Sequence, residues 1–239
     1  MKQNISLLLV CCLCVFTASA QPSKSASDLY DDGMKLVDNK SYKEALDAFK
    51  KAITKDPSNR DALYEAGWVC NELEQYAEAV TYLEKAKKIK PSEAKIYFEL
   101  GYADENTKNE AGAISSYKKA LELYPEYYSA AQNLGDIYYN KEDYENALVY
   151  YEQYLPGDDA DNYYNYKAGW CCNDLEKYSD AINYLEKYEP VENDDIAKKF
   201  AEIGYSNYKL EKQDEAVDAY EKAIDAKPGY GTAYRGLGN

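Results

Sequence analysis

Histidine is absent from the sequence, which removes the commonest general base and the commonest metal ligand of proteins. Ser-His and Cys-His nucleophiles and histidine-bound metals are therefore excluded. Most glycines stand alone, and the cluster near the C-terminus lacks the spacing of a phosphate-binding loop. The acidic pairs Asp158–Asp159 and Asp194–Asp195 lack the alternating spacing of a calcium loop, so we interpret them as solvated loop charges. We expect no catalytic activity, no cofactor and no metal site.

Basic residues are scarce as well. Lys and Arg number 28 against 43 Asp and Glu, which gives a formal net charge of −15 over 239 residues. Such a surface repels nucleic acids and anionic lipids and favours neutral or basic partners, so we expect no nucleic-acid partner. Tyrosine, by contrast, is abundant at 28 residues, and the question is how many of these rings serve packing.

Only three cysteines lie outside the apolar N-terminal stretch: Cys70, Cys171 and Cys172. The repeat described below puts Cys70 and Cys172 three units apart, beyond the reach of about 7 Å between Cα atoms that a disulfide allows. A bridge between the adjacent Cys171 and Cys172 would be strained inside a helix, and this pair is not a Cys-x-x-Cys motif. We predict buried thiols that act as small hydrophobic side chains.

Residues 1–20 combine a short basic start, an apolar run and a small-x-small ending at Ala20. This pattern is typical of a secretory signal peptide cleaved after Ala20, and it is too short for a membrane span. The alternative is a lipoprotein signal, but Cys11, Cys12 and Cys14 do not follow a small residue. The stretch resembles signals of Bacteroidota-type bacteria, which implies export across the inner membrane to the periplasm. Residues 21–25 form a polar linker.

A period of about 34 residues runs through the rest of the chain. It divides the sequence into residues 26–59, 60–93, 94–127, 128–161, 162–196 and 197–230, with a partial seventh unit at 231–239. Position eight is always glycine: Gly33, Gly67, Gly101, Gly135, Gly169, Gly204 and Gly238. Position twenty is alanine in the six complete units: Ala45, Ala79, Ala113, Ala147, Ala181 and Ala216.

Each unit contains two amphipathic segments with the helical period. Glycine within a helix costs up to about 1 kcal/mol relative to alanine, so its recurrence predicts a close approach of the second helix to the first. Position twenty-four is large and is expected to fill the gap to the neighbouring unit: Phe49, Leu83, Tyr117, Tyr151, Leu185 and Tyr220. Proline ends the second helix in four units: Pro57, Pro91, Pro125 and Pro228.

The period, the two small positions and the terminal proline resemble the tetratricopeptide repeat (TPR) family, over everything after the linker. The resemblance implies an all-α fold, an α-solenoid in which about six helix-turn-helix units and a partial seventh form a right-handed superhelix. It also implies a concave groove lined mainly by the first helix of each pair, and binding of proteins or peptides. Because units bury their apolar faces only against neighbours, stability is roughly a sum along the array.

Units four and five depart from the pattern. Pro156 and Pro190 stand three residues before the position at which the other units have proline. Tyr154 and Tyr188 stand where the other complete units have alanine. We predict shorter second helices, a local change of superhelix pitch at 154–162 and 188–196, and exposed acidic loops at 156–161 and 191–195. Most other tyrosines are assigned to packing: those at position seventeen start the second helix, and Tyr97, Tyr117, Tyr138, Tyr151, Tyr220 and Tyr234 are expected in the core.

In proteins of this fold, first-helix positions two, five, six, nine, twelve and thirteen face the groove. The predicted peptide-binding residues at positions five and nine are Tyr30, Tyr64, Phe98, Tyr166, Trp68, Tyr102, Trp170 and Tyr205. Position twelve adds Tyr139, together with Asn71 and Asn173, whose amides could pair with a peptide backbone. Met34 and Asp136 at position nine indicate that packing needs no ring there, so the rings favour a partner. The alternative is that the rings pack on one another and line nothing.

The charges at position six also bear on the partner. Asp31, Glu65, Glu99 and Glu202 are acidic, and Lys167 opposes them. TPR domains that grip the C-terminal carboxylate of chaperones use basic residues and asparagine at positions two, five and six, so no such clamp is expected here. The predicted function is a non-catalytic scaffold for an extended, partly apolar, neutral-to-basic polypeptide segment.

Two alternatives follow from Asn239, which falls inside the first helix of the seventh unit. The chain could be the N-terminal targeting or assembly module of a longer, enzymatic or membrane-associated protein. The uncapped last unit could also mediate self-association, because repeat arrays normally need a polar cap.

Overall fold

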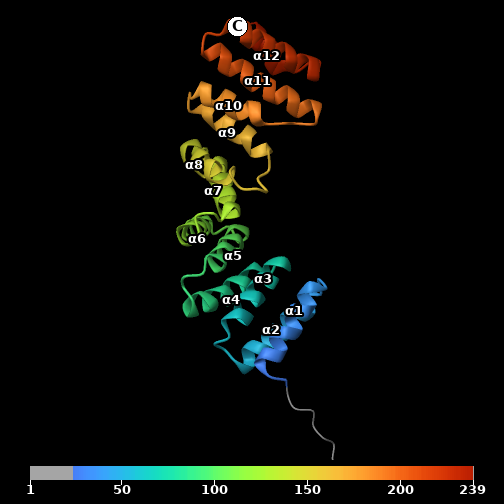
Figure 1. Cartoon of the computed structure of the whole chain (residues 1–239), viewed down its shortest axis with the longest axis vertical. Helices are drawn as coiled ribbons and strands as arrows, with labels where there is room; N and C mark the ends of the chain where they lie inside the picture. Colours follow the sequence, from blue (N-terminus) through green and yellow to red (C-terminus); the bar gives the residue numbers. More distant parts are fainter. Residues whose placement is uncertain (1–23, 239) are drawn as a thin grey trace, which may run out of the picture.

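The structure is a computed structural model that describes residues 24–238, so the expected signal peptide and most of the linker lie outside the described residues. Within that range the chain forms thirteen helices and no strand. The helices are α1 (Ala26–Asp38), α2 (Tyr42–Lys55), α3 (Arg60–Glu72), α4 (Tyr76–Ile89), α5 (Ala94–Asn106), α6 (Glu110–Leu123), α7 (Tyr128–Asn140), α8 (Tyr144–Tyr154), α9 (Tyr163–Asp174), α10 (Tyr178–Lys187), α11 (Asn193–Lys209), α12 (Gln213–Ala226) and α13 (Gly231–Leu237). Antiparallel pairs stack along one long axis, from α1–α2 at one end to α11–α13 at the other (Figure 1). The chain is thus an all-α solenoid.

Local sequence signals set the helix boundaries. Ser25 and Asp28 form a reciprocal capping box at the start of α1: the Asp28 amide donates to Ser25 Oγ at 3.1 Å, and the Ser25 amide donates to Asp28 Oδ2 at 2.9 Å. The Asn59 side chain caps α3 by accepting from the Ala62 amide at 3.0 Å. Each helix pair turns through one residue with left-handed φ between 57° and 64°: Lys40, Glu74, Lys108, Glu142, Glu176 and Glu211.

The glycines at position eight confirm the close approach of the two helices. A Cβ atom on Gly101 would lie 2.6 Å from the Tyr117 ring, and one on Gly67 would lie 2.5 Å from Leu83 Cγ. The large side chains at position twenty-four fill the space over the glycine of their own unit and also contact the next unit, as in the pair of Tyr151 and Tyr164 at 5.3 Å. Tyr117 also reaches the next unit, since Asn133 Nδ2 donates to its hydroxyl at 2.9 Å.

Units four and five differ from the others as predicted in helix length. The second helices α8 and α10 have 11 and 10 residues, whereas α2, α4, α6 and α12 have 14. Tyr154 and Tyr188 occupy the contact that alanine makes elsewhere, and each is 6% exposed. Asp158 and Asp159 lie in an exposed loop. The change of superhelix pitch stays a prediction.

The second acidic loop was placed wrongly, because α11 begins at Asn193. Asp194 and Asp195 lie in its first turn, where carboxylates interact favourably with the helix dipole, and each pairs with Lys198 at 2.9 Å. Lys227 also pairs with Asp194. Hydrogen bonds from Lys227 and Lys198 lower the pKa of Asp194 to about 2.

The packing assignments hold for most of the tyrosines, but Tyr97 is only partly buried. Tyr117, Tyr151 and Tyr220 are buried, but Tyr234 is 52% exposed, so its core assignment is wrong. The described cysteines, Cys70, Cys171 and Cys172, are buried and unbridged, as predicted. Burial raises the pKa of each of these three thiols to about 12, which makes them poor nucleophiles. No helix between residues 24 and 238 has the length and apolar character to cross a bilayer.

Candidate functional site: the face of the first helices

The rings at position nine form a regular set of contacts between units. Each packs edge-on against the position-seventeen tyrosine of the preceding unit, with centroid distances of 4.9–6.1 Å. The four pairs are Tyr42–Trp68, Tyr76–Tyr102, Tyr144–Trp170 and Tyr178–Tyr205. Aromatic pairs in this geometry contribute about 0.5–1.5 kcal/mol beyond the area that they bury.

These pairs show that the rings at position nine take part in packing between units, although Met34 and Asp136 occupy this position in units one and four. In unit four Asp136 stands at position nine, and Glu110, not tyrosine, stands at position seventeen of unit three. The rings nevertheless remain partly accessible. Tyr102 and Tyr205 are 38% and 39% exposed, and Trp68 and Trp170 are half-buried. Position nine therefore serves both packing and an aromatic surface.

The rings at position five lie beside further aromatic residues. Tyr30 packs on Phe49 at 5.8 Å, and Phe98 stacks on Tyr127 at 4.8 Å. Tyr64 lies under the ammonium group of Lys95, which is 3.9 Å from the ring centroid. This geometry is a close cation–π contact.

Two rings beside this face were not among the predicted residues. Tyr163 stacks on Tyr166 at 5.7 Å, and it stands at position two, so the positional rule could have found it. Tyr127 ends unit three at position thirty-four, where the first-helix rule gives no signal. Tyr139, at position twelve, packs on Trp170 at 5.5 Å.

Asn71 and Asn173 are not free to hold a peptide backbone, which corrects their predicted role. Asn71 is 3% exposed, and its Nδ2 donates to the Glu99 carboxylate at 2.8 Å and to the Glu99 carbonyl at 3.1 Å. Asn173 is 5% exposed and donates to the Glu202 carboxylate at 2.9 Å. Each asparagine thus fixes a glutamate of the following unit.

The two asparagine–glutamate pairs differ in one partner. Asn173 Oδ1 accepts from the Ser206 hydroxyl at 2.6 Å. In the other pair alanine, Ala103, stands at the corresponding position ten, and Asn71 Oδ1 is buried without a hydrogen bond. The pair of Asn71 and Glu99 is therefore one hydrogen bond short of the pair of Asn173 and Glu202.

The carboxylates of these pairs carry unusual electrostatics. Burial raises the pKa of Glu99 to about 7, against the hydrogen bond from Asn71, which lowers it. Burial likewise raises the pKa of Glu202. Neither glutamate forms an ion pair with any residue of the described chain. Burying a carboxylate without a counter-charge is costly, so both sites would gain from an external cation.

Between the two pairs, Asp136 of unit four is neutralised by Lys167 of unit five. Asp136 Oδ1 accepts from Lys167 Nζ at 2.6 Å and from the Tyr151 hydroxyl at 2.9 Å. Asp136 Oδ2 accepts from the Tyr164 hydroxyl at 2.7 Å. The face therefore has two uncompensated carboxylates with a satisfied ion pair between them. In residues 24–238 no three His, Cys, Asp or Glu side chains are grouped so that they could hold a metal ion.

A family profile described as tetratricopeptide repeat matches residues 30–94 and 98–164, and a second profile of the same description matches residues 200–230. The chain belongs to the tetratricopeptide repeat family. Its membership agrees with the helix pairs, the glycine and alanine positions and the short turns of the structure. Among curated protein sequences none matches this TPR chain.

Solved structures of TPR proteins resemble most of the array. YrrB, described as a TPR protein with an unusual peptide-binding site, covers 80% of this chain and 98% of its own at 20% identity, with a TM-score of 0.67. The C-terminal part of a TPR repeat-containing protein from Cytophaga hutchinsonii covers 82% and 78% at 21% identity, with a TM-score of 0.65. PilF of Pseudomonas aeruginosa covers 88% and 95% at 18% identity, with a TM-score of 0.59. At these identities the likeness shows a shared TPR fold.

Proposed function

We propose that this TPR protein is a non-catalytic scaffold that holds an extended, partly apolar, neutral-to-basic polypeptide segment along its first helices. The observation that carries the proposal is the pair of carboxylates on this face, the buried Glu99 and the partly buried Glu202. Neither forms an ion pair with a residue of the described chain, burial raises the pKa of both, and Glu202 lines one pocket with the partly exposed Tyr205. Basic side chains of a partner would supply the missing charge, and the exposed edges of Tyr102 and Tyr205 would supply apolar contact.

The comparisons support a polypeptide ligand through the fold. TPR domains in general bind proteins or peptides, and YrrB, which shares the fold, is described as having a peptide-binding site. The detailed contacts proposed here rest on this chain's own residues.

Peptides selected from a random display library provide the test. We expect the bound sequences to be rich in Lys or Arg and in apolar residues. Tyr102→Ser and Glu99→Gln should each weaken a selected peptide about tenfold, since each removes a contact of about 1–2 kcal/mol. Trp68 and Trp170 are poorer targets, because alanine at either position would leave a cavity beside Tyr42 or Tyr144.

Val149→Ser is the matched control, because Val149 is an apolar surface residue, 57% exposed, on the second helix α8. It should leave peptide affinity unchanged, and circular dichroism should show all three variants folded. If the peptides bind Tyr102→Ser and Glu99→Gln as tightly as the parent protein, the first-helix face is not the binding site.

We further propose that the protein is exported and acts in the periplasm. The intact mass of protein recovered from cells tests this: cleavage after Ala20 would leave 27.2 kDa less the first twenty residues, and lipidation would add mass at a retained cysteine. A much larger mass would instead favour the alternative of a targeting module within a longer protein.

A further inference from the structure

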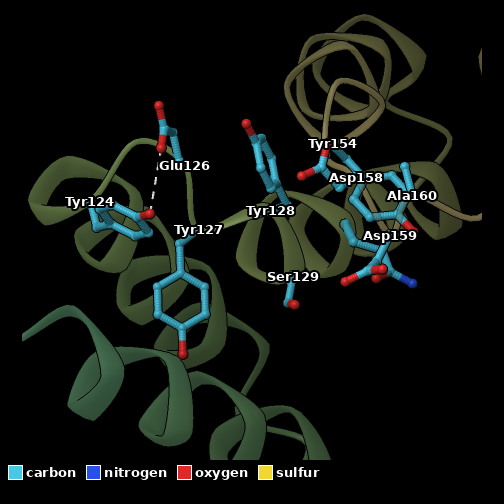
Figure 2. A pocket seen from close by; sticks show the side chains of 11 residues that line it. Tyr124, Glu126, Tyr127, Tyr128, Ser129, Tyr154, Asp158, Asp159 and Ala160 are labelled. Carbon is cyan, nitrogen blue, oxygen red and sulfur yellow. Dashed lines mark hydrogen bonds between the residues drawn. The ribbon is translucent and has the colours of Figure 1, made fainter.

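A cavity of about 420 Å³ lies where the turn between α6 and α7 faces the loop between α8 and α9 (Figure 2). We call it the junction pocket. Its volume is within the range of about 300–1,000 Å³ for small-ligand sites. Its walls include four tyrosines and three carboxylates: Tyr124, Tyr127, Tyr128, Tyr154, Glu126, Asp158 and Asp159.

The pocket exists because α8 is short. The chain leaves the helix after Tyr154 and folds back in a loop that is fixed at several points. The Gly157 amide donates to the Tyr154 carbonyl at 3.0 Å, and the Asp161 amide donates to the Tyr154 hydroxyl at 2.6 Å. Gly157 also packs so closely on Tyr128 that a Cβ atom would lie 2.7 Å from the ring. The loop therefore presents Asp158 and Asp159 from a defined position, on the far side of Tyr128 from Tyr124 (Figure 2).

The charge of the junction pocket is unbalanced. No lysine or arginine lines it, and Asp158 and Asp159 form no ion pair with any residue of the described chain. Among the described residues, the Glu126 carboxylate accepts a hydrogen bond only from the Tyr124 hydroxyl, at 3.4 Å. Three carboxylates of like charge around one cavity repel one another, and a bound cation would relieve that repulsion.

The tyrosine rings and carboxylates that line the junction pocket are suited to binding an organic cation. A guanidinium group stacks on aromatic faces and forms paired hydrogen bonds with carboxylates, and an ammonium group also binds over tyrosine rings. We propose that the junction pocket binds the cationic side chain of an arginine, or less tightly of a lysine, carried by a polypeptide partner.

The pocket joins the first-helix face through one residue. Tyr127 lines the pocket and stacks on Phe98 at 4.8 Å. Ser129 and Gln132, which also line it, stand at positions two and five of unit four. A segment that runs along the first helices can thus place one side chain in the pocket. Only this link to a longer segment rests on the proposed function; the binding of the cation itself does not.

Nuclear magnetic resonance of the whole ¹⁵N-labelled protein tests the proposal with a small probe. N-acetyl-arginine methylamide should shift the amide signals of Gly157 and Ser129, whereas the neutral analogue N-acetyl-citrulline methylamide should not. Asp158→Asn combined with Asp159→Asn should weaken the arginine probe at least about fivefold, as expected for two lost surface charge pairs. Glu221→Gln combined with Asp225→Asn removes the same charge from exposed sites of α12 and should change nothing.

Several outcomes would overturn the proposal. Equal binding of the citrulline probe would indicate a neutral polar site, as for a saccharide. Stronger shifts of the same amides by calcium chloride would indicate a metal site. Unchanged arginine binding in the double variant would place the cation elsewhere. Tyr102→Ser should leave the affinity for the arginine probe unchanged. A wrong assignment of the peptide site on the first-helix face and a wrong assignment of the junction pocket therefore give different results.

Discussion

Two asparagines at equivalent positions of the array have different hydrogen-bond partners. Asn173 Oδ1 is satisfied by Ser206, whereas Asn71 Oδ1 is buried without a hydrogen-bond partner, and Ala103 stands at the position equivalent to Ser206. A buried unsatisfied acceptor costs about 1–3 kcal/mol. One serine hydroxyl therefore separates a complete polar site from an incomplete one.

Ala103→Ser should supply the missing donor to Asn71. Ala103 and Ser206 are both fully buried at position ten, so the hydroxyl should fit. We expect a gain of about 0.5–1 kcal/mol in the free energy of unfolding, after the lower helix propensity of serine is subtracted. Urea denaturation measures it. The reverse change, Ser206→Ala, should cost about 1–3 kcal/mol, and a loss of stability in both variants would contradict the role of the missing donor.

The second residue-scale prediction concerns pH. The pKa of Glu99 is raised by burial to about 7, above its value of about 4.3 in an unfolded chain. Between these values the folded state binds more protons, so the free energy of unfolding falls as pH rises from about 4.3 to 7. Glu99→Gln should therefore stabilise the protein at pH 8 by about 1–3 kcal/mol and flatten this dependence.

Denaturation at pH 5 and pH 8 measures that effect. Glu65 and Glu202 also have a pKa raised by burial, so part of the dependence should persist in the variant. Glu221→Gln, at an exposed site of α12, should leave the dependence unchanged. If Glu99→Gln is no more stable than the parent at pH 8, the carboxylate is better solvated than its burial indicates.

At the scale of the helix pair, glycine at position eight sets the distance between the two helices. Gly101→Ala should cost about 1–3 kcal/mol, because the Tyr117 ring lies where the new methyl group would go and is fully buried. Thermal unfolding measures the loss. Gly231→Ala is the matched control: its nearest atom would be 3.8 Å away, so it should be neutral or slightly stabilising. Equal melting temperatures for the two variants would contradict the packing role.

The sequence predicts structure best at the scale of the helix pair. The fixed period predicted the fold, the close glycines and the short α8 and α10, because these depend on contacts within one unit. The predicted site was less complete, since its contacts cross units. Neither the pairing of Tyr42 with Trp68 nor the donation from Asn71 to Glu99 follows from reading each unit alone. The junction pocket was missed because a loop, not a helix position, forms one wall.

At the scale of the whole molecule, pairs stack in sequence along one axis, so each unit is held mainly by the units beside it (Figure 1). Stability in such an array is close to a sum of unit and interface contributions. The two shortened helices lie in adjacent units, α8 and α10, and Pro156 and Pro190 follow them. The junctions of units four and five therefore depend on tyrosine contacts, such as that of Tyr154 on Tyr164 at 4.8 Å.

The ring pairs give the protein two built-in optical reporters. Its only tryptophans, Trp68 and Trp170, each lie edge-on against a tyrosine of the preceding unit, one toward either end of the array. Emission from Trp68 responds to separation of α2 from α3, and emission from Trp170 responds to separation of α8 from α9. Replacing one indole at a time with phenylalanine would leave a single tryptophan emitter, so that fluorescence could follow the separation of α2 from α3 and of α8 from α9 individually.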